Sequence, residues 1–116
     1  MTNSIYGIIG LAAKAGAIIS GSLACESVIL KGRAKLVIIA GDSADNTKKK
    51  FLKIAANSDA GVRVFGTSEE LGHYCGKVNR SVAVITETNF AKKLTVLIDD
   101  LTRKNGGGLI GKDQSI

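Results

Sequence analysis

The sequence predicts an α/β protein, a three-layer α/β/α sandwich around a small mixed sheet of about four strands. Short β-branched runs alternate along the chain with segments of helical periodicity. The clearest run, residues 34–40, is almost wholly apolar, which is typical of a strand covered by helices on both faces. The chain has 116 residues, 45% of them hydrophobic, which is enough for one buried core and leaves little for a second.

The N-terminal elements follow from the spacing of apolar residues and from glycine. Helical periodicity predicts a helix that starts at Ser4, a candidate cap, and ends at Gly16. The residues expected on its buried face are Ile5, Ile8, Ile9 and Ala12. A brief strand over 17–20 follows, and Gly21 and Ser22 then open a second helix.

The middle of the chain is predicted to place a basic helix between two strands. Gly32 ends the preceding helix, and Gly41 ends the strand over 34–40. The basic helix is expected to turn inward Phe51, Leu52, Ala55 and Ala56, and to turn mostly outward Lys48, Lys49, Lys50 and Lys53. A second short strand is predicted over 62–65.

The C-terminal part is predicted to add two helices and one strand. Thr67 and Glu70 have the spacing of a capping box, so a short helix is expected to begin there and to end near Gly76. A third strand is predicted over 81–86. The last helix is amphipathic, and its apolar face is expected to comprise Phe90, Leu94, Leu97, Ile98 and Leu101.

The folded domain is predicted to span residues 1–101, because the helical periodicity ends at Leu101. Residues 102–116 include consecutive glycines and are expected to form a flexible tail. Neither an internal repeat nor an interdomain linker is visible in the sequence, so a single folded domain is expected.

Net charge gives the first indication of function. Lys and Arg number 16 against 10 Asp and Glu, a net charge of +6 at pH 7. A basic balance of this size favours a polyanionic partner, nucleic acid before a membrane surface. The alternative is a basic protein that has no such partner.

No apolar run approaches the ~20 residues that cross a bilayer, and no basic cluster precedes an apolar core at the N-terminus. A cytoplasmic, reduced protein is therefore expected.

Enzyme chemistry finds little support in the residues. The glycine-rich phosphate-binding motifs of nucleotide enzymes are absent. Asp42 follows the best strand but lacks the acidic partners of a phosphotransfer site, which favours helix capping by Asp42, Ser43 or Asp45. His73 and Cys75 are two positions apart on a helix, so their side chains diverge. Cys25 is expected in the core. The protein is therefore predicted to be no enzyme, with no catalytic residue, cofactor or metal.

The basic residues fall into groups that favour RNA. These groups are Lys31, Arg33 and Lys35; Lys48 to Lys50 with Lys53; Lys77 with Arg80; and Lys92 with Lys93. Lys77 and Arg80 lie in a predicted loop, where binding residues are common. Aromatic residues are scarce, so no stacking platform for single strands is expected, and no helix-turn-helix pair is evident. The mode of binding that these residues still favour is recognition of structured RNA through contacts with its backbone.

Several segments together resemble the ribosomal protein superfamily named after L7Ae, L30e, S12e and Gadd45. Gly21 and Ser22 open a helix, and residues 31–42 continue as Lys-Gly-Arg-Ala-Lys-Leu-Val-Ile-Ile-Ala-Gly-Asp. The segments that resemble its bacterial YlxQ-like branch are 42–50, 70–72 with 76–77, and 90–94. The resemblance extends over about residues 4 to 101 and implies a kink-turn RNA-binding fold of the same α/β/α class.

The resemblance also implies where RNA would bind. In this superfamily the second helix opens with a Gly-x-Asn-Glu element, whose Asn and Glu read sheared G·A pairs, followed by a phosphate-binding Lys. Here Leu23 stands in place of the Asn, Ala24 in place of the Glu, and Ser27 in place of the Lys. The loop 76–81 corresponds to a second RNA-contacting loop. The implied RNA-binding residues are Gly21, Ser22, Ser27, Lys31, Lys77, Val78, Asn79 and Arg80.

Two functional hypotheses follow. The first is a non-enzymatic RNA-binding, ribosomal-protein-like factor of the translation apparatus that recognises structured, kink-turn-like RNA, with ribosomal RNA as one candidate. Leu23 and Ala24 cannot hydrogen-bond base edges, whereas phosphate attraction needs only Lys and Arg. The second is a protein-interaction or dimerisation module that keeps the fold but uses Leu23 and Ala24 as an apolar contact. The chain is expected to be a monomer or a weak homodimer.

Overall fold

Four strands form the central sheet in the computed structural model, which describes residues 2–106. They are β1 (Ile18–Ser20), β2 (Leu36–Ile39), β3 (Gly61–Val64) and β4 (Val82–Ile85), in the order β1-β4-β2-β3. β2 and β3 are parallel, whereas β4 is antiparallel to both of its neighbours. The prediction of a small mixed sheet is confirmed.

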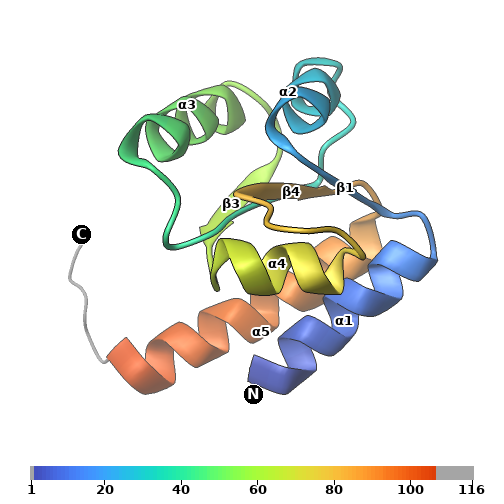
Figure 1. Cartoon of the computed structure of the whole chain (residues 1–116), viewed down its shortest axis with the longest axis vertical. Coiled ribbons are helices and arrows are strands. Elements are labelled where there is room, and N and C mark those ends of the chain that lie inside the picture. Colours follow the sequence, from blue (N-terminus) through green and yellow to red (C-terminus); the bar gives the residue numbers. More distant parts are fainter. Residues whose placement is uncertain (1, 107–116) are drawn as a thin grey trace.

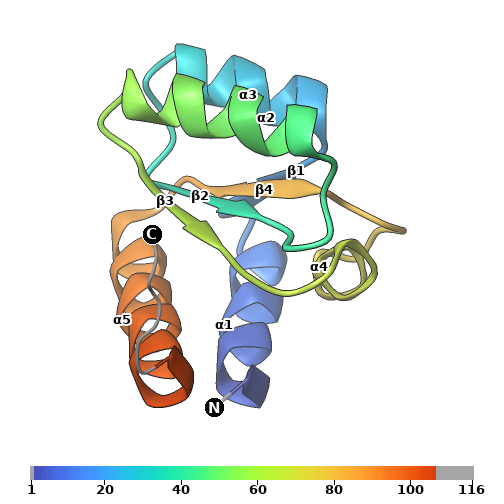
Figure 2. The ribbon, with the colours of Figure 1, turned by 90° about the vertical axis from the view of Figure 1, so that its left-hand side faces the viewer.

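Helices cover both faces of this sheet (Figure 1 and Figure 2). One layer contains α2 (Ser22–Leu30) and α3 (Asp45–Ala56). The other contains α1 (Thr2–Lys14), the short α4 (Ser68–Tyr74) and α5 (Thr88–Gly106). The chain is therefore the three-layer sandwich that the alternation of strands and helices predicts.

The core lies on both sides of the sheet, because successive strand residues point to opposite faces. In β2, Leu36 and Ile38 pack toward α1 and α5, whereas Val37 and Ile39 pack toward α2 and α3. All four side chains are fully buried. Because both faces of β2 are buried, almost every residue of this strand is apolar, as the sequence predicts.

Three sequence predictions about the helices differ from the structure. Leu52 and Ala56 are exposed, because Phe51 and Ala55 already face the sheet and a step of one residue turns a side chain by about 100°. Ser4 lies inside α1 and does not cap it. The last helix runs past Leu101 to Gly106, while residues 107–116 of the predicted tail lie outside the described residues.

The predicted capping box forms in part. Thr67 Oγ1 accepts a hydrogen bond from the N–H of Glu70 at 3.1 Å. The Glu70 carboxylate, in turn, accepts from the Thr67 hydroxyl and from the hydroxyl of buried Tyr6, the latter at 2.8 Å. The cap therefore also ties α4 to α1. Among residues 2–106, no helix is long and apolar enough to cross a membrane.

The sheet register sets the two ends of the sandwich apart. Ser20 pairs with Ala83, and Ile39 pairs with Val82, so the end of β1 and the start of β4 lie together. We call this the α2-entry end, because α2 begins there. The segment 31–35, which connects α2 to β2, lies at the opposite end, which we call the α2-exit end.

Candidate nucleic-acid interface

Gly21 positions the start of α2. Its φ of 96° and ψ of 144° lie in a region that residues with a Cβ rarely adopt, so glycine allows the sharp entry into the helix. Its N–H donates to the carbonyl of Val82 at 3.1 Å, which fixes the helix entry to the first residue of β4. In the described part of the chain no side chain caps this end, so the first-turn N–H groups have no side-chain acceptor there.

The loop 75–81 lies folded back against α4. The N–H of Lys77 donates to the carbonyl of Gly72 at 2.8 Å, and the N–H of Arg80 donates to the carbonyl of Ser68 at 2.9 Å. Gly72 is buried beneath the loop, where a Cβ would lie only 2.8 Å from the backbone of Val78 and Asn79. A glycine at position 72 is therefore what allows the loop to approach α4 this closely.

Arg80 joins the loop to the start of α2. Its Nη1 donates to the carbonyls of Val78 and Asn79, at 2.9 and 3.0 Å. Its buried Nε has no hydrogen-bond partner among residues 2–106 and lies 3.9 Å from the position that a Cβ on Gly21 would occupy. The guanidinium is thereby held beside the uncapped helix entry, where it places a positive charge.

The structure brings together six of the residues implied to bind RNA and separates two others. The six at the α2-entry end are Gly21, Ser22, Lys77, Val78, Asn79 and Arg80. Ser27 is exposed along the length of α2. Lys31 is the C-cap of this helix, so about 15 Å separate it from Gly21 along the helix axis.

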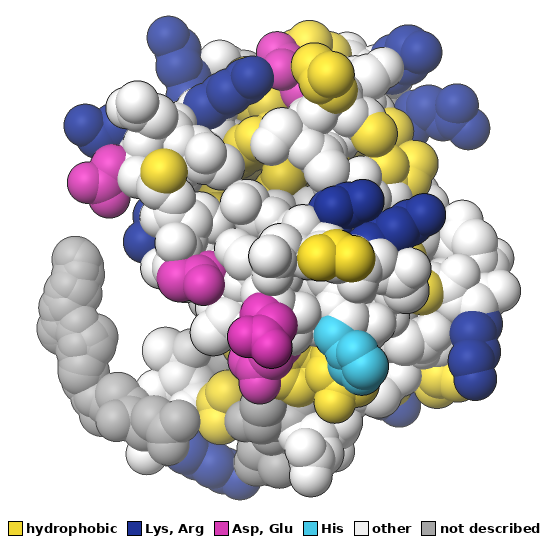
Figure 3. All heavy atoms as spheres, in the orientation of Figure 1, with side chains coloured by type: hydrophobic (Ala, Val, Ile, Leu, Met, Phe, Trp, Pro, Cys, Tyr) yellow, Lys and Arg dark blue, Asp and Glu magenta, His cyan; other side chains and the backbone are white. Residues whose placement is uncertain are grey.

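The α2-entry end is both basic and apolar. Leu23 is 85% exposed and Val78 is 77% exposed, and Ala24 is exposed as well. Figure 3 shows basic side chains beside a hydrophobic one on the face above the histidine of α4. Phosphate groups are attracted by such cations and by helix N–H groups, whereas Leu23 and Ala24 offer no hydrogen bond to a base.

The chain's other candidate chemical groups are structural. His73 is exposed and lies edge-on against Tyr74, with ring centroids 4.9 Å apart. Cys25 lies in the core as predicted; its Sγ donates to the Ile19 carbonyl, and burial raises the pKa of this thiol to about 12. Both cysteines are free thiols. Within the described range 2–106, no group of three His, Cys, Asp or Glu residues is placed to hold a metal ion.

Asp42 is a helix cap, though not of the helix that follows it. Its Oδ1 accepts hydrogen bonds from the N–H of Ser68 at 2.8 Å and from the Ser68 hydroxyl at 2.9 Å. The backbone bond first, and then the hydroxyl bond, lower the pKa of the Asp42 carboxyl below its usual value. Asp42 thereby fixes the start of α4, and with it the base of the loop 75–81.

Asp42→Asn is expected to lower the free energy of unfolding at neutral pH, because it removes the charge that accepts both Ser68 bonds. The folded-state pKa lies below the ordinary value of 3.8. The stabilisation is therefore present above that value and is lost as the pH falls through the folded-state pKa. Urea unfolding across this range should show the gap between wild type and variant closing in acid. A gap that stays constant would contradict this role of the charge.

Comparison with known proteins places the chain among ribosomal-type proteins. A family model described as "Ribosomal protein L7Ae/L30e/S12e/Gadd45 family" matches residues 3–96. The chain is 32% identical over 94 residues to the RNA-binding protein YlxQ of Bacillus subtilis, covering 81% of this chain and 94% of that protein. It is 34% identical over 92 residues to the RNA-binding protein YlxQ of Enterococcus faecium, covering 79% and 88%.

Two solved structures of other proteins have the same fold as this chain. A protein of unknown function from Bacillus halodurans superimposes with a TM-score of 0.79 at 33% identity, covering 82% of this chain and 96% of that one. The Giardia lamblia 15.5kD RNA binding protein superimposes with a TM-score of 0.72 at 22% identity, covering 86% and 88%. The second likeness concerns the fold alone.

Proposed function

Because the chain belongs to the ribosomal protein L7Ae/L30e/S12e/Gadd45 family, in its YlxQ-like branch, we propose that it binds structured RNA in the translation apparatus. The family membership also confirms the prediction that the chain is not an enzyme. Two relatives are named RNA-binding proteins, and the chain carries a net charge of +6. RNA of a kink-turn-like shape is the proposed ligand, with ribosomal RNA as one candidate.

One observation carries the proposal: Arg80 lies beside Gly21 at the uncapped start of α2. A phosphate oxygen at this helix entry would accept from the first-turn N–H groups of α2 and be attracted by the positive charge of the Arg80 guanidinium. Lys77 would add a second positive charge. Val78, at 77% exposure, would pack against a sugar or a base.

The affinity of this interface is expected to depend strongly on salt. With about four phosphate contacts, the logarithm of the association constant should fall with the logarithm of the salt concentration at a slope near −3. Electrophoretic mobility shift with structured RNA at several salt concentrations measures that slope. A slope near zero would contradict phosphate-dominated binding.

Lys77→Gln is expected to remove one phosphate contact. The salt slope should become shallower by about 0.8, and the affinity should fall about sixfold at about 0.1 M salt. Lys77 suits this test because its side chain is exposed and makes no hydrogen bond or ion pair among residues 2–106. Arg80 is less suitable, because it also holds the carbonyls of Val78 and Asn79.

Lys49→Gln is the matched control for Lys77→Gln. Lys49 is likewise exposed, but it lies on α3, a different element from the loop 75–81. Its removal changes the net charge equally and should leave the salt slope nearly unchanged. If both variants lose the same affinity, binding follows the overall charge of the protein rather than the loop 75–81.

A second candidate function is protein interaction, and the exposed leucines of α2 favour it. Leu23 and Leu30 are 85% and 68% exposed, and their spacing of seven residues places them on one helix face. An exposed apolar stripe is typical of a contact surface. A homodimer in sedimentation velocity that Leu23→Asp dissociates, together with no RNA binding, would favour this function over the first.

A further inference from the structure

The α2-exit end carries a second group of cations, in the segment that connects α2 to β2. Lys31, Arg33 and Lys35 are all exposed there. Lys92, on the outward side of α5, adds a fourth positive charge. None of the four side chains forms a hydrogen bond or an ion pair with another residue in the described part of the chain. Four unneutralised cations at one end of a small protein repel one another unless an anion binds there.

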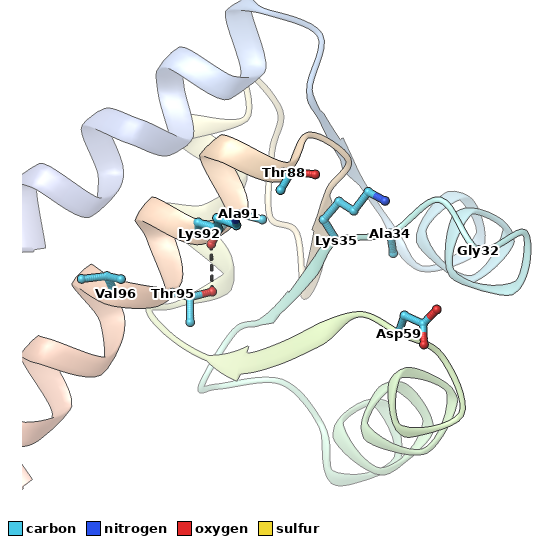
Figure 4. Close-up of a pocket in the computed structure, with 9 residues that line it drawn as sticks. All are labelled: Gly32, Ala34, Lys35, Asp59, Thr88, Ala91, Lys92, Thr95 and Val96. Carbon is cyan, nitrogen blue, oxygen red and sulfur yellow. Dashed lines mark hydrogen bonds between the residues drawn. The ribbon is translucent and has the colours of Figure 1, made fainter.

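Two of these cations, Lys35 and Lys92, line a cleft of about 540 Å³ between the connecting segment and α5 (Figure 4). Its lining residues are Gly32, Ala34, Lys35, Asp59, Thr88, Ala91, Lys92, Thr95 and Val96. Asp59 is the single carboxylate among them. Two smaller hollows, of about 460 and 250 Å³, also border Gly32.

The shape of this surface suits a polyanionic chain better than a small anion. Lys35 and Lys92 come from different elements and lie along the cleft, so their charges do not converge on one point (Figure 4). Lys31 and Arg33 extend the positive charge beyond it. Exposed lysines and arginines spread along a hollow match the repeated phosphates of a nucleic-acid backbone.

The α2-exit end is also distinct from the α2-entry end. The nine residues of α2 separate Lys31 from Gly21 by about 15 Å along the helix. The cleft opens between the connecting segment and α5, whereas Arg80 and Gly21 lie where α2 meets β4. A short RNA element held at one end therefore leaves the cations of the other end unpaired.

We propose that Lys31, Arg33, Lys35 and Lys92 form a second phosphate-binding surface, which holds a separate RNA segment and lets the protein bridge two parts of a folded RNA. This inference rests on the proposed function, because it takes RNA as the partner of the α2-entry end.

The test counts RNA molecules bound per protein. The probe is a minimal RNA hairpin, and the measurement is sedimentation velocity at low salt. The wild-type protein should bind a second hairpin at saturation. Arg33→Gln with Lys35→Gln should lose one hairpin, and Lys77→Gln with Arg80→Gln should lose the other. The control, Lys49→Gln with Lys53→Gln on α3, should keep both. Thermal unfolding checks that each variant remains folded.

Failure of this inference is distinguishable from failure of the proposed function. A single hairpin, lost in the Lys77 and Arg80 variant but kept in the Arg33 and Lys35 variant, would overturn the second surface alone. Absence of any bound hairpin would overturn both.

A second experiment uses guanosine monophosphate as the probe. Saturable binding of this nucleotide that needs Arg33 and Lys35, without binding of a second hairpin, would assign the cleft to a small phosphate ligand and overturn the RNA surface.

Discussion

Gly72→Ala is expected to lower the free energy of unfolding by about 1–3 kcal/mol and to remove most of the RNA affinity. A Cβ at position 72 would lie 2.8 Å from the backbone N of Asn79 and from the carbonyl carbon and oxygen of Val78. These are backbone atoms, so no flexible side chain can move aside. The loop 75–81 must therefore shift, and Arg80 must leave its place beside Gly21. Urea unfolding and an RNA mobility shift measure the two effects.

Gly10→Ala is the control for this prediction, because Gly10 also lies within a helix but a Cβ there would meet nothing within 4 Å. Alanine reduces the entropy that the chain loses on folding, so this variant should gain about 0.5–1 kcal/mol of stability. Its RNA affinity should be unchanged. If Gly72→Ala behaves like Gly10→Ala, then close packing against α4 does not hold the loop 75–81.

Replacing Leu23 by Asn together with Ala24 by Glu is expected to create a preference for kink-turn RNA. Both positions are exposed in the first turn of α2, so polar side chains fit without disturbing the core. Each base contact with good geometry contributes about 1–3 kcal/mol of discrimination. Affinity for an RNA with sheared G·A pairs should therefore rise at least about tenfold. The measurement compares this RNA with one in which Watson–Crick pairs replace the sheared pairs.

Leu30→Asn is the control for the Leu23 and Ala24 variant. Leu30 is an exposed leucine on the same helix, at its C-terminal end, and should have no effect on the preference between the two RNAs. If the Asn–Glu variant binds both RNAs more tightly by the same factor, the helix entry does not face the bases. The site would then bind phosphate groups whatever the base sequence of the RNA.

Much of the fold was predictable because it follows from local patterns. The apolar run of β2 indicated a strand covered on both faces, and the spacing in α5 indicated one buried helix face. Thr67 and Glu70 marked the start of α4 through hydrogen bonds within one helical turn. Such patterns involve only residues that are close together in the sequence, so they can be recognised without the tertiary structure. They failed at Leu52, where apolar character alone did not give the direction of the side chain.

The candidate site was only partly predictable, because its geometry depends on residues far apart in the chain. Resemblance to a family indicated the start of α2 and the loop 76–81, but it grouped Lys31 with them. Gly72, a glycine within the short helix α4, was a possible sign of a close backbone approach. Only the structure shows that the approaching backbone belongs to Val78 and Asn79.

The amino-acid sequence by itself determined the layers, the basic character and the family, since periodicity, charge and short motifs are properties of the chain alone. Tertiary structure decided which charges act together: it placed Arg80 beside Gly21 and brought Asp42 to the start of α4 as a second acceptor beside Thr67. The physical reason is that pairing between strands distant in sequence sets which loops meet, and no local pattern contains that pairing.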